Sequence, residues 1–330
     1  MKNKLRLLAG ALAALCTLAS CTRESANSQG TVPQKLVPFQ FLLDWQPEPT
    51  YLGVYYAREK GYFRELGLDV EIVPSWGANQ AVAAVAAGKY QISTASGGAT
   101  VLGYNNGAKI VSLAVIYPHV PSVVYGLASK HIQDPQDLIG KRIGVYPGSI
   151  TTNEFDAFLA ANHIEKSKID IISLSGGDIP LLLSDKLDAV LHYYEMSPVV
   201  VETDPKMPAI DGRRTFCIRL SEHGVPGYGL NIVTSRDSFD KNHELLLKVA
   251  RAAVKGYEEA YRNPEDAVAV FQRLFPDKSS AYLKESLTRV NKMLSTPIGA
   301  QDAAGWQQTI DLYQSLGLLK NPPTPADILP

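Results

Sequence analysis

Cysteine is scarce in this chain of 330 residues, and the motifs that mark common catalytic centres are missing. Three cysteines are too few for a disulfide framework. The six histidines form no HExxH motif and no pair three or four residues apart, which argues against a zinc enzyme. The chain also lacks a Walker loop, a GxGxxG motif after the first expected strand and a GxSxG elbow. The sequence therefore predicts no catalytic residue, metal or cofactor, and a protein that is not an enzyme.

An excess of charge of either sign is missing as well. There are 32 basic and 33 acidic side chains, which gives a formal net charge of −1. Such a chain has no basic field to attract nucleic acid, so no nucleic-acid partner is expected. A hydrophobic fraction of 45% is ordinary for a globular protein and excludes a disordered or multi-span membrane chain. At about 150 residues per domain, the length predicts two domains.

The N-terminal segment has the pattern of an export signal. Lys2, Lys4 and Arg6 precede an uncharged run over residues 7–20. That run is shorter than the roughly 20 apolar residues that span a bilayer, and its basic flank is typical of a secretory signal. It ends in Leu-Ala-Ser-Cys, which resembles the bacterial lipobox, so residues 1–20 are expected to be cleaved and Cys21 to carry lipid. The alternative is an ordinary signal peptide in which Cys21 is incidental.

Residues 21–36 are polar and lack periodicity, so they are expected to form a flexible tether between the lipid and the folded body. Cleavage would remove three basic residues and no acidic ones, taking the formal net charge from −1 to −4. Cys16 would leave with the signal, and Cys217 is then expected to be a small buried residue without a disulfide partner.

The body alternates between β-rich and helical segments. Strands are expected at 39–43, 69–73 and 90–95, and helices at 52–66 and 78–87. This alternation predicts βα units and a mainly parallel sheet. Residues 169–193 repeat the order of strand, glycine-containing loop, helix, turn and strand, which indicates two similar α/β lobes. Four further helices are expected at 243–261, 264–274, 279–293 and 303–316.

Aromatic and acidic residues follow the first two strands. Asp44 and Trp45 end the first strand, Tyr51 lies shortly after it, and Trp76 follows the second strand. Ligands bind at the carboxyl ends of strands in open α/β sheets, where a carboxylate and an indole can hydrogen-bond to and stack on a flat ligand. The alternative is that Asp44 caps a turn over a buried Trp45. Trp306, on a late helix, is expected in the core or on the surface.

Two small-residue loops precede helices in corresponding positions of the two lobes. The first contains Ser96, Gly97 and Thr100, and the second contains Ser149 and Thr151. Small residues at a helix N-terminus bring backbone N–H groups close to a ligand. Each loop alone could equally be a simple turn, but their matching positions favour binding.

A later strand end carries Tyr193, Tyr194 and Glu195. One carboxylate with two phenols could bind an amino-substituted heteroaromatic ring. The alternative is a tyrosine pair packed at the sheet edge beside a solvated Glu195. Tyr228 precedes the strand that is expected to return to the first lobe, and would lie near the hinge and the cleft mouth.

Several segments together resemble one family, the type II periplasmic binding proteins of the thiamine-pyrimidine-precursor and sulfonate/nitrate group. They are LDW (43–45), GVYYA (53–57), KGYF (60–63), GLDV (67–70), AGK (87–89), LIGKRIG (138–144) and LDAV (187–190). The likeness extends from Val37 to about Leu316. It implies a two-lobed type II periplasmic-binding-protein fold, each lobe a mainly parallel sheet flanked by helices, joined by two hinge crossovers.

The resemblance also implies a domain division and a set of partners. Residues 37–128 with 235–330 would form lobe one, and residues 129–234 lobe two. The protein would be a monomeric, lipid-anchored, extracytoplasmic receptor that delivers a small ligand to an ABC permease and ATPase, held at the membrane through Cys21.

The Asp-Trp pair is similar to the branch of this family that binds flat aminopyrimidines. The ligand implied is a small heteroaromatic vitamin precursor, with a riboflavin-like vitamin or an aliphatic sulfonate or nitrate as alternatives. The branch also includes a pyrimidine synthase that consumes its own histidine. Here Tyr51 lies near the place of that histidine and the cysteine-rich motif is absent, which argues against synthase chemistry.

Overall fold

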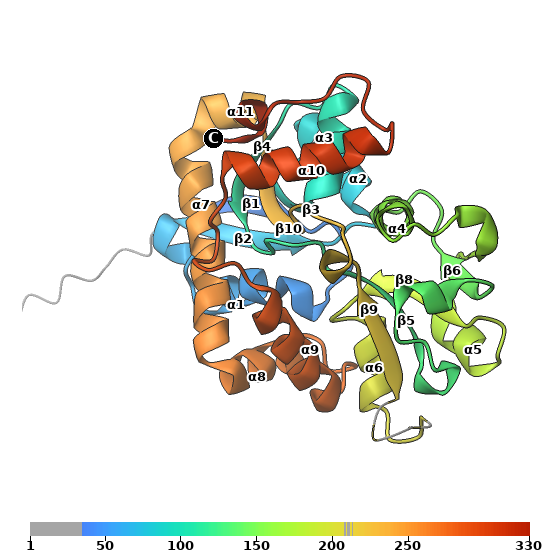
Figure 1. The fold of residues 1–330 in the computed structure, drawn as a ribbon. Coiled ribbons are helices and arrows are strands. Elements are labelled where there is room, and N and C mark those ends of the chain that lie inside the picture. Colours follow the sequence, from blue (N-terminus) through green and yellow to red (C-terminus); the bar gives the residue numbers. More distant parts are fainter. Residues whose placement is uncertain (1–34, 208, 210–211, 213) are drawn as a thin grey trace, which may run out of the picture. The chain divides into compact units, whose positions relative to one another are not determined.

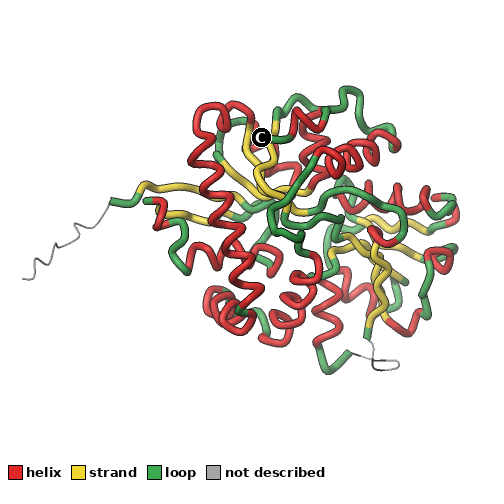
Figure 2. The backbone as a smooth tube through the Cα atoms, turned by 60° about the vertical axis from the view of Figure 1, so that its left-hand side comes forward, coloured by secondary structure: helices red, strands yellow, loops and turns green. Residues whose placement is uncertain are grey.

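The computed structural model describes residues 35–207, 209, 212 and 214–330. The predicted signal peptide, the lipid-bearing Cys21 and the tether up to residue 34 lie outside the described residues. Residues from Leu36 to Pro330 form one compact unit. It contains two five-stranded sheets with helices packed around them, which confirms the predicted α/β class (Figures 1 and 2).

The first sheet has the strand order β2-β1-β3-β10-β4, and the second has the order β7-β6-β8-β5-β9. The strands of the first sheet are β1 (Val37–Leu42), β2 (Leu68–Val73), β3 (Ile92–Ser96), β4 (Ile110–Val115) and β10 (Leu230–Ser235). Those of the second are β5 (Ser122–Leu127), β6 (Arg142–Val145), β7 (Asp170–Ser173), β8 (Ala189–Tyr193) and β9 (Thr215–Arg219). Both sheets therefore have the same strand order. Each contains four strands that are consecutive in the chain (β1 to β4 or β6 to β9), arranged as second, first, third and fourth, and one further strand, β10 or β5, lies between the third and the fourth.

One strand in each sheet runs against the others. β10 pairs antiparallel with β3 and β4, whereas β1 pairs parallel with β2 and β3. β5 pairs antiparallel with β8 and β9, whereas β6 pairs parallel with β7 and β8. The chain passes between the sheets twice, before β5 and after β9. The antiparallel strand of each sheet, β5 or β10, is the one that directly follows a crossing. The sheets are thus mixed, with a parallel majority.

The sheet order differs from the predicted lobe boundaries in the placement of two strands. A boundary at residue 128 assigned β5 to the first lobe, and one at residue 235 assigned β10 to the second. Hydrogen bonding places β5 in the second sheet and β10 in the first. Both strands are buried throughout, so their hydrophobic pattern does not reveal which sheet they join.

Helices pack around both sheets (Figure 2). They are α1 (Leu52–Glu59), α2 (Ala78–Ala86), α3 (Gly97–Asn105), α4 (Ile150–Ala161), α5 (Asp178–Leu183), α6 (Ser197–Thr203), α7 (Arg236–Arg262), α8 (Pro264–Leu274), α9 (Ser280–Met293), α10 (Ala303–Ser315) and α11 (Pro325–Ile328). Among the described residues, none of these helices combines the length and apolarity needed to cross a bilayer. Cys217, in β9, is partly buried and unpaired, and burial raises the pKa of its thiol to about 11.

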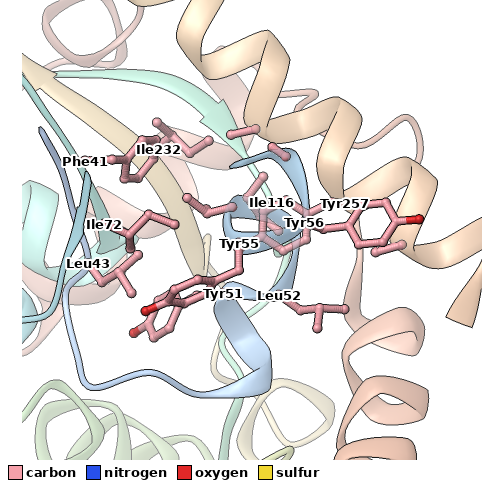
Figure 3. Packing of buried hydrophobic residues seen from close by; sticks show 14 of the residues in the cluster. Phe41, Leu43, Tyr51, Leu52, Tyr55, Tyr56, Ile72, Ile116, Ile232 and Tyr257 are labelled. Carbon is pink, nitrogen blue, oxygen red and sulfur yellow. The ribbon is translucent and has the colours of Figure 1, made fainter. Parts of the chain in front are cut away.

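The core of the first lobe lies between its sheet and α1. Figure 3 shows Phe41, Ile72 and Ile232 from the sheet packed together with aromatic residues of α1. Helix α7 packs closely along α1, and a Cβ at Gly256 of α7 would lie 2.0 Å from the carbonyl oxygen of Gly53. A Cβ at Gly53 would lie 2.2 Å from the ring of Tyr257, so no larger residue fits there without displacement.

Candidate functional site

Asp44 follows β1 and is fixed by two hydroxyl groups. Its Oδ1 accepts hydrogen bonds from Tyr51 Oη at 2.8 Å and from Thr94 Oγ1 at 2.6 Å, and its N–H donates to Thr94 Oγ1 at 2.9 Å. Within the described residues, Oδ2 makes no hydrogen bond. Burial raises the pKa of this carboxyl, and the two hydroxyl hydrogen bonds oppose the rise. Asp44 is therefore a held, buried carboxyl with one oxygen left for a further partner.

Two exposed indoles follow the ends of β1 and β2, that of Trp45 directly after Asp44 and that of Trp76 three residues after β2. Trp45 is 41% exposed and Trp76 is 71% exposed. Their ring centroids are 6.4 Å apart in an edge-to-face arrangement, and Gln46 Nε2 donates to the Ser75 carbonyl at 2.8 Å, which ties the two segments together. Trp45 is thus not a core residue beneath Asp44. Trp306, in contrast, is fully buried.

Glu195 follows β8 and is fully buried. Its Oε1 accepts a hydrogen bond from Thr50 Oγ1 at 2.5 Å, and its carbonyl accepts one from Ser286 Oγ at 2.8 Å. Within the described part of the chain, Oε2 has no partner. Burial raises the pKa of this carboxyl to about 7. The alternative of a solvated Glu195 is wrong, because the side chain is enclosed between segments of both lobes.

Tyr193 lies at the same strand end as Glu195, and three carboxyl groups affect the pKa of its phenol. The phenol is half-buried, and its pKa is raised well above its usual range by burial and then by Glu154, Asp44 and Glu195. These acids follow or lie on three different elements: α4, β1 and β8. Ser122, which bonds to Glu154, is the direct strand partner of Tyr193, and the adjacent residues Thr50 and Tyr51 bond to Glu195 and Asp44, so the strand ends of both sheets meet in this region.

Tyr194 lies in a different environment. Its ring contacts the guanidinium of Arg289 at 4.6 Å and that of Arg219 at 5.3 Å, and its carbonyl accepts a hydrogen bond from Arg289 Nη1 at 3.0 Å. Two cations on one ring give Tyr194 a clear packing function between β9 and α9.

The first small-residue loop uses its polar groups inside the protein. Ser96 Oγ caps α3 by accepting from Ala99 N at 3.1 Å, and the N–H of Gly97 donates to the Gly229 carbonyl at 2.7 Å. Thr100 is fully buried and donates to the Ser96 carbonyl at 3.1 Å. These contacts hold β3, α3 and the returning segment together.

The second loop forms a local hydroxyl network. Ser149 caps α4 by accepting from Thr152 N at 3.4 Å, and its hydroxyl lies 2.8 Å from that of the buried Thr151. The network fixes the first turn of α4, from which Glu154 projects one turn later.

Tyr51 and Tyr228 do not present free aromatic faces. Tyr51 is 1% exposed, and its hydroxyl is bonded to Asp44. Tyr228 is buried, its ring packs edge-on against Trp306 at 5.2 Å, and its hydroxyl accepts from Asp302 N at 3.0 Å. Tyr51 therefore holds Asp44, and Tyr228 packs in the protein interior and bonds to Asp302.

Sequence reasoning missed Glu154. It is 2% exposed on α4, and Ser122 at the start of β5 donates a hydrogen bond to its Oε2. Burial raises its pKa to about 7. One signal was present: Ile150, Glu154 and Phe158 are spaced four apart on the apolar side of α4, and an acid in such a stripe predicts a buried carboxyl. Among the described residues, no group of three or more His, Cys, Asp or Glu side chains could hold a metal ion.

Comparisons with known proteins agree with this architecture. The chain is 26% identical over 330 residues to the formylaminopyrimidine-binding protein of Halalkalibacterium halodurans, covering 96% of this chain and 95% of that protein. It is 25% identical over 232 residues to the 4-amino-5-hydroxymethyl-2-methylpyrimidine phosphate synthase THI11 of Saccharomyces cerevisiae, covering 69% of this chain and 68% of that protein.

Solved structures carry the same fold. The periplasmic aliphatic sulphonate binding protein SsuA from Escherichia coli superposes with a TM-score of 0.71 at 14% identity, covering 88% of this chain and 91% of that one. This likeness confirms the predicted periplasmic-binding-protein fold. A family model described as NMT1/THI5 like matches residues 48–267. Because that match spans most of the chain, the protein belongs to the NMT1/THI5-like family.

Proposed function

We propose that this protein is the substrate-binding component of an ABC importer and that it captures a pyrimidine-type heterocycle between its two lobes. The observation that carries the proposal is the gathering of three buried carboxyls at the strand ends. Glu195 and Asp44 bond to the adjacent residues Thr50 and Tyr51, and Glu154 bonds to Ser122, the direct strand partner of Tyr193. Within the described residues, no lysine or arginine hydrogen-bonds to any of the three carboxylates. A buried carboxyl without an ion-pair partner needs hydrogen-bond donors, and a ligand can supply them.

The charge of this site favours one ligand class over the others. A sulfonate or nitrate would meet three acids and, among the described residues, no cation hydrogen-bonded to them, so its binding would be opposed by like charge wherever the acids are ionised. An aminopyrimidine offers N–H donors to carboxylates and ring nitrogens that accept a proton. Because burial raises the pKa of Glu154 and Glu195 to about 7, each carboxyl can act as acceptor or donor near neutral pH.

The exposed indole of Trp45 supplies the aromatic surface in this proposal. A flat ring stacked on it would have its edge toward Asp44, the preceding residue. Trp76, edge-on to Trp45, would cover the outer side. Of the phenols considered for stacking, Tyr193 stays in the proposed site, whereas Tyr51 and Tyr228 act by holding other groups.

A binding function is proposed over synthase chemistry. Tyr51, which lies near the place expected for the synthase histidine, donates its hydroxyl hydrogen bond to Asp44 and is 1% exposed. A phenol held in this way is a structural hydrogen-bond donor, not a group ready to be consumed.

The remaining features complete the proposed receptor. The signal peptide would direct export, lipid on Cys21 would hold the protein at the outer side of the cell membrane, and residues 22–36 would tether the body. A lipid anchor raises the local concentration of the receptor near its permease and ATPase. The monomeric body would close by hinge motion at the two crossings between the sheets.

A thermal-shift series tests the ligand class. Binding to the folded state alone raises the unfolding temperature by mass action. We expect an aminopyrimidine to raise it in a saturable way, and riboflavin, an alkanesulfonate and nitrate to leave it unchanged. The Glu195→Gln variant should lose most of the aminopyrimidine effect, whereas Glu165→Gln, an exposed surface acid, should keep it. Stabilisation by the anions alone would contradict the proposal.

A further inference from the structure

The Glu154 carboxyl is bonded through one of its two oxygens to a residue at the start of the second lobe. Ser122 Oγ donates to Oε2, and within the described residues Oε1 makes no hydrogen bond. Ser122 is the first residue of β5, immediately after the chain enters the second lobe. The capped first turn of α4 fixes the backbone one turn before Glu154.

Tyr193 lies beside this carboxyl because of strand register. Ser122 and Tyr193 are direct partners in the antiparallel pair of β5 and β8. Directly opposed residues point to the same face of a sheet, with Cβ atoms about 5 Å apart. The Glu154 carboxyl, bonded to Ser122, therefore comes to the same face as the Tyr193 phenol.

Tyr313 approaches from α10 in the other lobe. It is 1% exposed, and within the described residues its hydroxyl has no hydrogen-bond partner. The pKa of Tyr313 is raised well above its usual range by burial and then by Glu154 and Tyr193. The hydroxyl lies over Gly98, where a Cβ would come within 1.9 Å of it, so the glycine leaves the room that this phenol occupies.

We propose that Glu154, Tyr313 and Tyr193 form a second polar subsite that binds an amine or amide N–H on the substituent of the ligand. The inference rests on the proposed function and deepens it, because it assigns the ligand a second group of hydrogen-bond donors. Asp44 and Glu195 then bind the heteroaromatic ring, and Glu154 binds the group that the ring carries.

The chemistry of the three groups fits this division. A carboxylate oxygen without a partner accepts from an N–H, and an ammonium would add a charge-assisted bond. A buried hydroxyl without a partner is costly, so the Tyr313 hydroxyl favours a ligand group that can hydrogen-bond to it. Burial raises the pKa of Glu154 to about 7, and an ammonium placed beside the carboxyl would lower it again.

Two ligands that differ in one group test the subsite. We would titrate calorimetrically an aminopyrimidine that carries an aminomethyl substituent and its counterpart that carries a methyl group in the same place. The wild-type protein is expected to prefer the aminomethyl ligand by about tenfold or more. Glu154→Gln should remove this preference, because the affinity for the aminomethyl ligand falls by more than the affinity for the methyl ligand.

Controls separate this inference from folding and from the proposed function. Glu165→Gln should keep the preference, and thermal unfolding shows whether each variant is folded. Tyr313→Phe removes only a hydroxyl and should reduce the preference even if Glu154→Gln does not fold. A preference that survives both substitutions, or an equal loss of affinity for both ligands, would overturn the subsite. If the wild type binds neither pyrimidine, the proposed function itself is wrong and the subsite falls with it.

Discussion

The hydroxyl of Thr50 donates a hydrogen bond of 2.5 Å to the carboxylate of Glu195, across 145 residues of sequence. Thr50 follows β1 of the first sheet, and Glu195 follows β8 of the second. Tyr257, from α7, donates to the Thr50 carbonyl at 2.8 Å and so fixes this segment from the other side. A carboxyl proposed to bind ligand is therefore also a direct link between the two lobes.

Removing the hydroxyl is expected to weaken ligand binding. Thr50→Val keeps the shape of the side chain but leaves a buried carboxylate oxygen without its donor, a change that costs about 1–3 kcal/mol. The hydrogen bond from Thr50 lowers the pKa of Glu195, so its loss should raise that pKa further. Titration with an aminopyrimidine across pH measures both effects.

Thr288→Val is the matched control, since the Thr288 hydroxyl serves only the Lys284 carbonyl on an exposed face of α9. Equal affinities for Thr50→Val and Thr288→Val would show that the link between the lobes does not contribute.

The two buried glutamates give stability a defined pH dependence. The folded-state pKa of Glu154 and of Glu195 is about 7, against 4.5 for the free side chain, because burial disfavours the charged form. The folded state then holds more protons than the unfolded state between these values. Without ligand, the free energy of unfolding should fall as pH rises from about 4.5 through 7, by up to about 3 kcal/mol per carboxyl.

Urea unfolding near pH 5 and near pH 8 tests this dependence. Glu154→Gln can keep the hydrogen bond from Ser122 and carries no charge, so it should be more stable than the wild type at the higher pH and similar at the lower. A variant as pH-sensitive as the wild type would show that Glu154 does not hold its proton as described.

The two tryptophans Trp45 and Trp306 should separate binding from folding. Trp45 is 41% exposed, so Trp45→Ala is expected to cost about 1 kcal/mol or more of binding with little loss of stability. Trp306 is fully buried, so Trp306→Ala should cost about 3–5 kcal/mol of unfolding free energy. Unchanged affinity with reduced stability in Trp45→Ala would assign that indole to the fold.

Close packing of two helices predicts a strong effect of one added methyl group. A Cβ on Gly53 of α1 would lie 2.2 Å from the Tyr257 ring on α7. Gly53→Ala must therefore move a buried aromatic ring, and overpacking of this kind costs about 1–3 kcal/mol. Chemical unfolding measures the loss; a variant as stable as the wild type would mean that the two helices separate at low cost.

Membrane attachment through Cys21 is tested in cells. Cys21→Ser removes the acceptor for lipid, so incorporation of a labelled fatty acid should be lost and the exported protein should leave the membrane fraction. A wild-type protein that takes up no label and fractionates away from the membrane would support the ordinary signal peptide instead.

Local pattern was sufficient to predict much of this fold and only part of the site. The alternation of strands and helices predicted the α/β class, because the hydrophobic periodicity of each element depends only on residues close together in the sequence. The predicted helix at 243–261 matches the part of α7 that follows a kink at Asn242, whose backbone is not helical. The short first part, which Ser235 caps through a side-chain bond to Ser238 N, was not predicted, because periodicity does not encode a cap. The lobe to which β5 or β10 belongs depends on contacts far apart in sequence, which no local pattern carries.

The candidate site shows the same division. Asp44 and Glu195 were predicted because they follow strands, and the structure gives both of them buried positions. Tyr228 precedes a strand and was also predicted to line the site, yet its ring packs on Trp306. Trp306 lies 78 residues further along the chain, and local sequence patterns do not reveal such a contact. Glu154 was missed because it lies within a helix and not at a strand end. Its partner Ser122 is on β5, 32 residues earlier in the sequence.

The central claim is that three buried carboxyls and an exposed indole bind a pyrimidine-type heterocycle. Calorimetric titration of the purified wild-type protein with an aminopyrimidine and with an alkanesulfonate, in the same buffer near neutral pH, tests it most directly. The account predicts saturable one-to-one binding of the aminopyrimidine and no heat of binding from the sulfonate. Binding of the sulfonate without binding of the aminopyrimidine would contradict it.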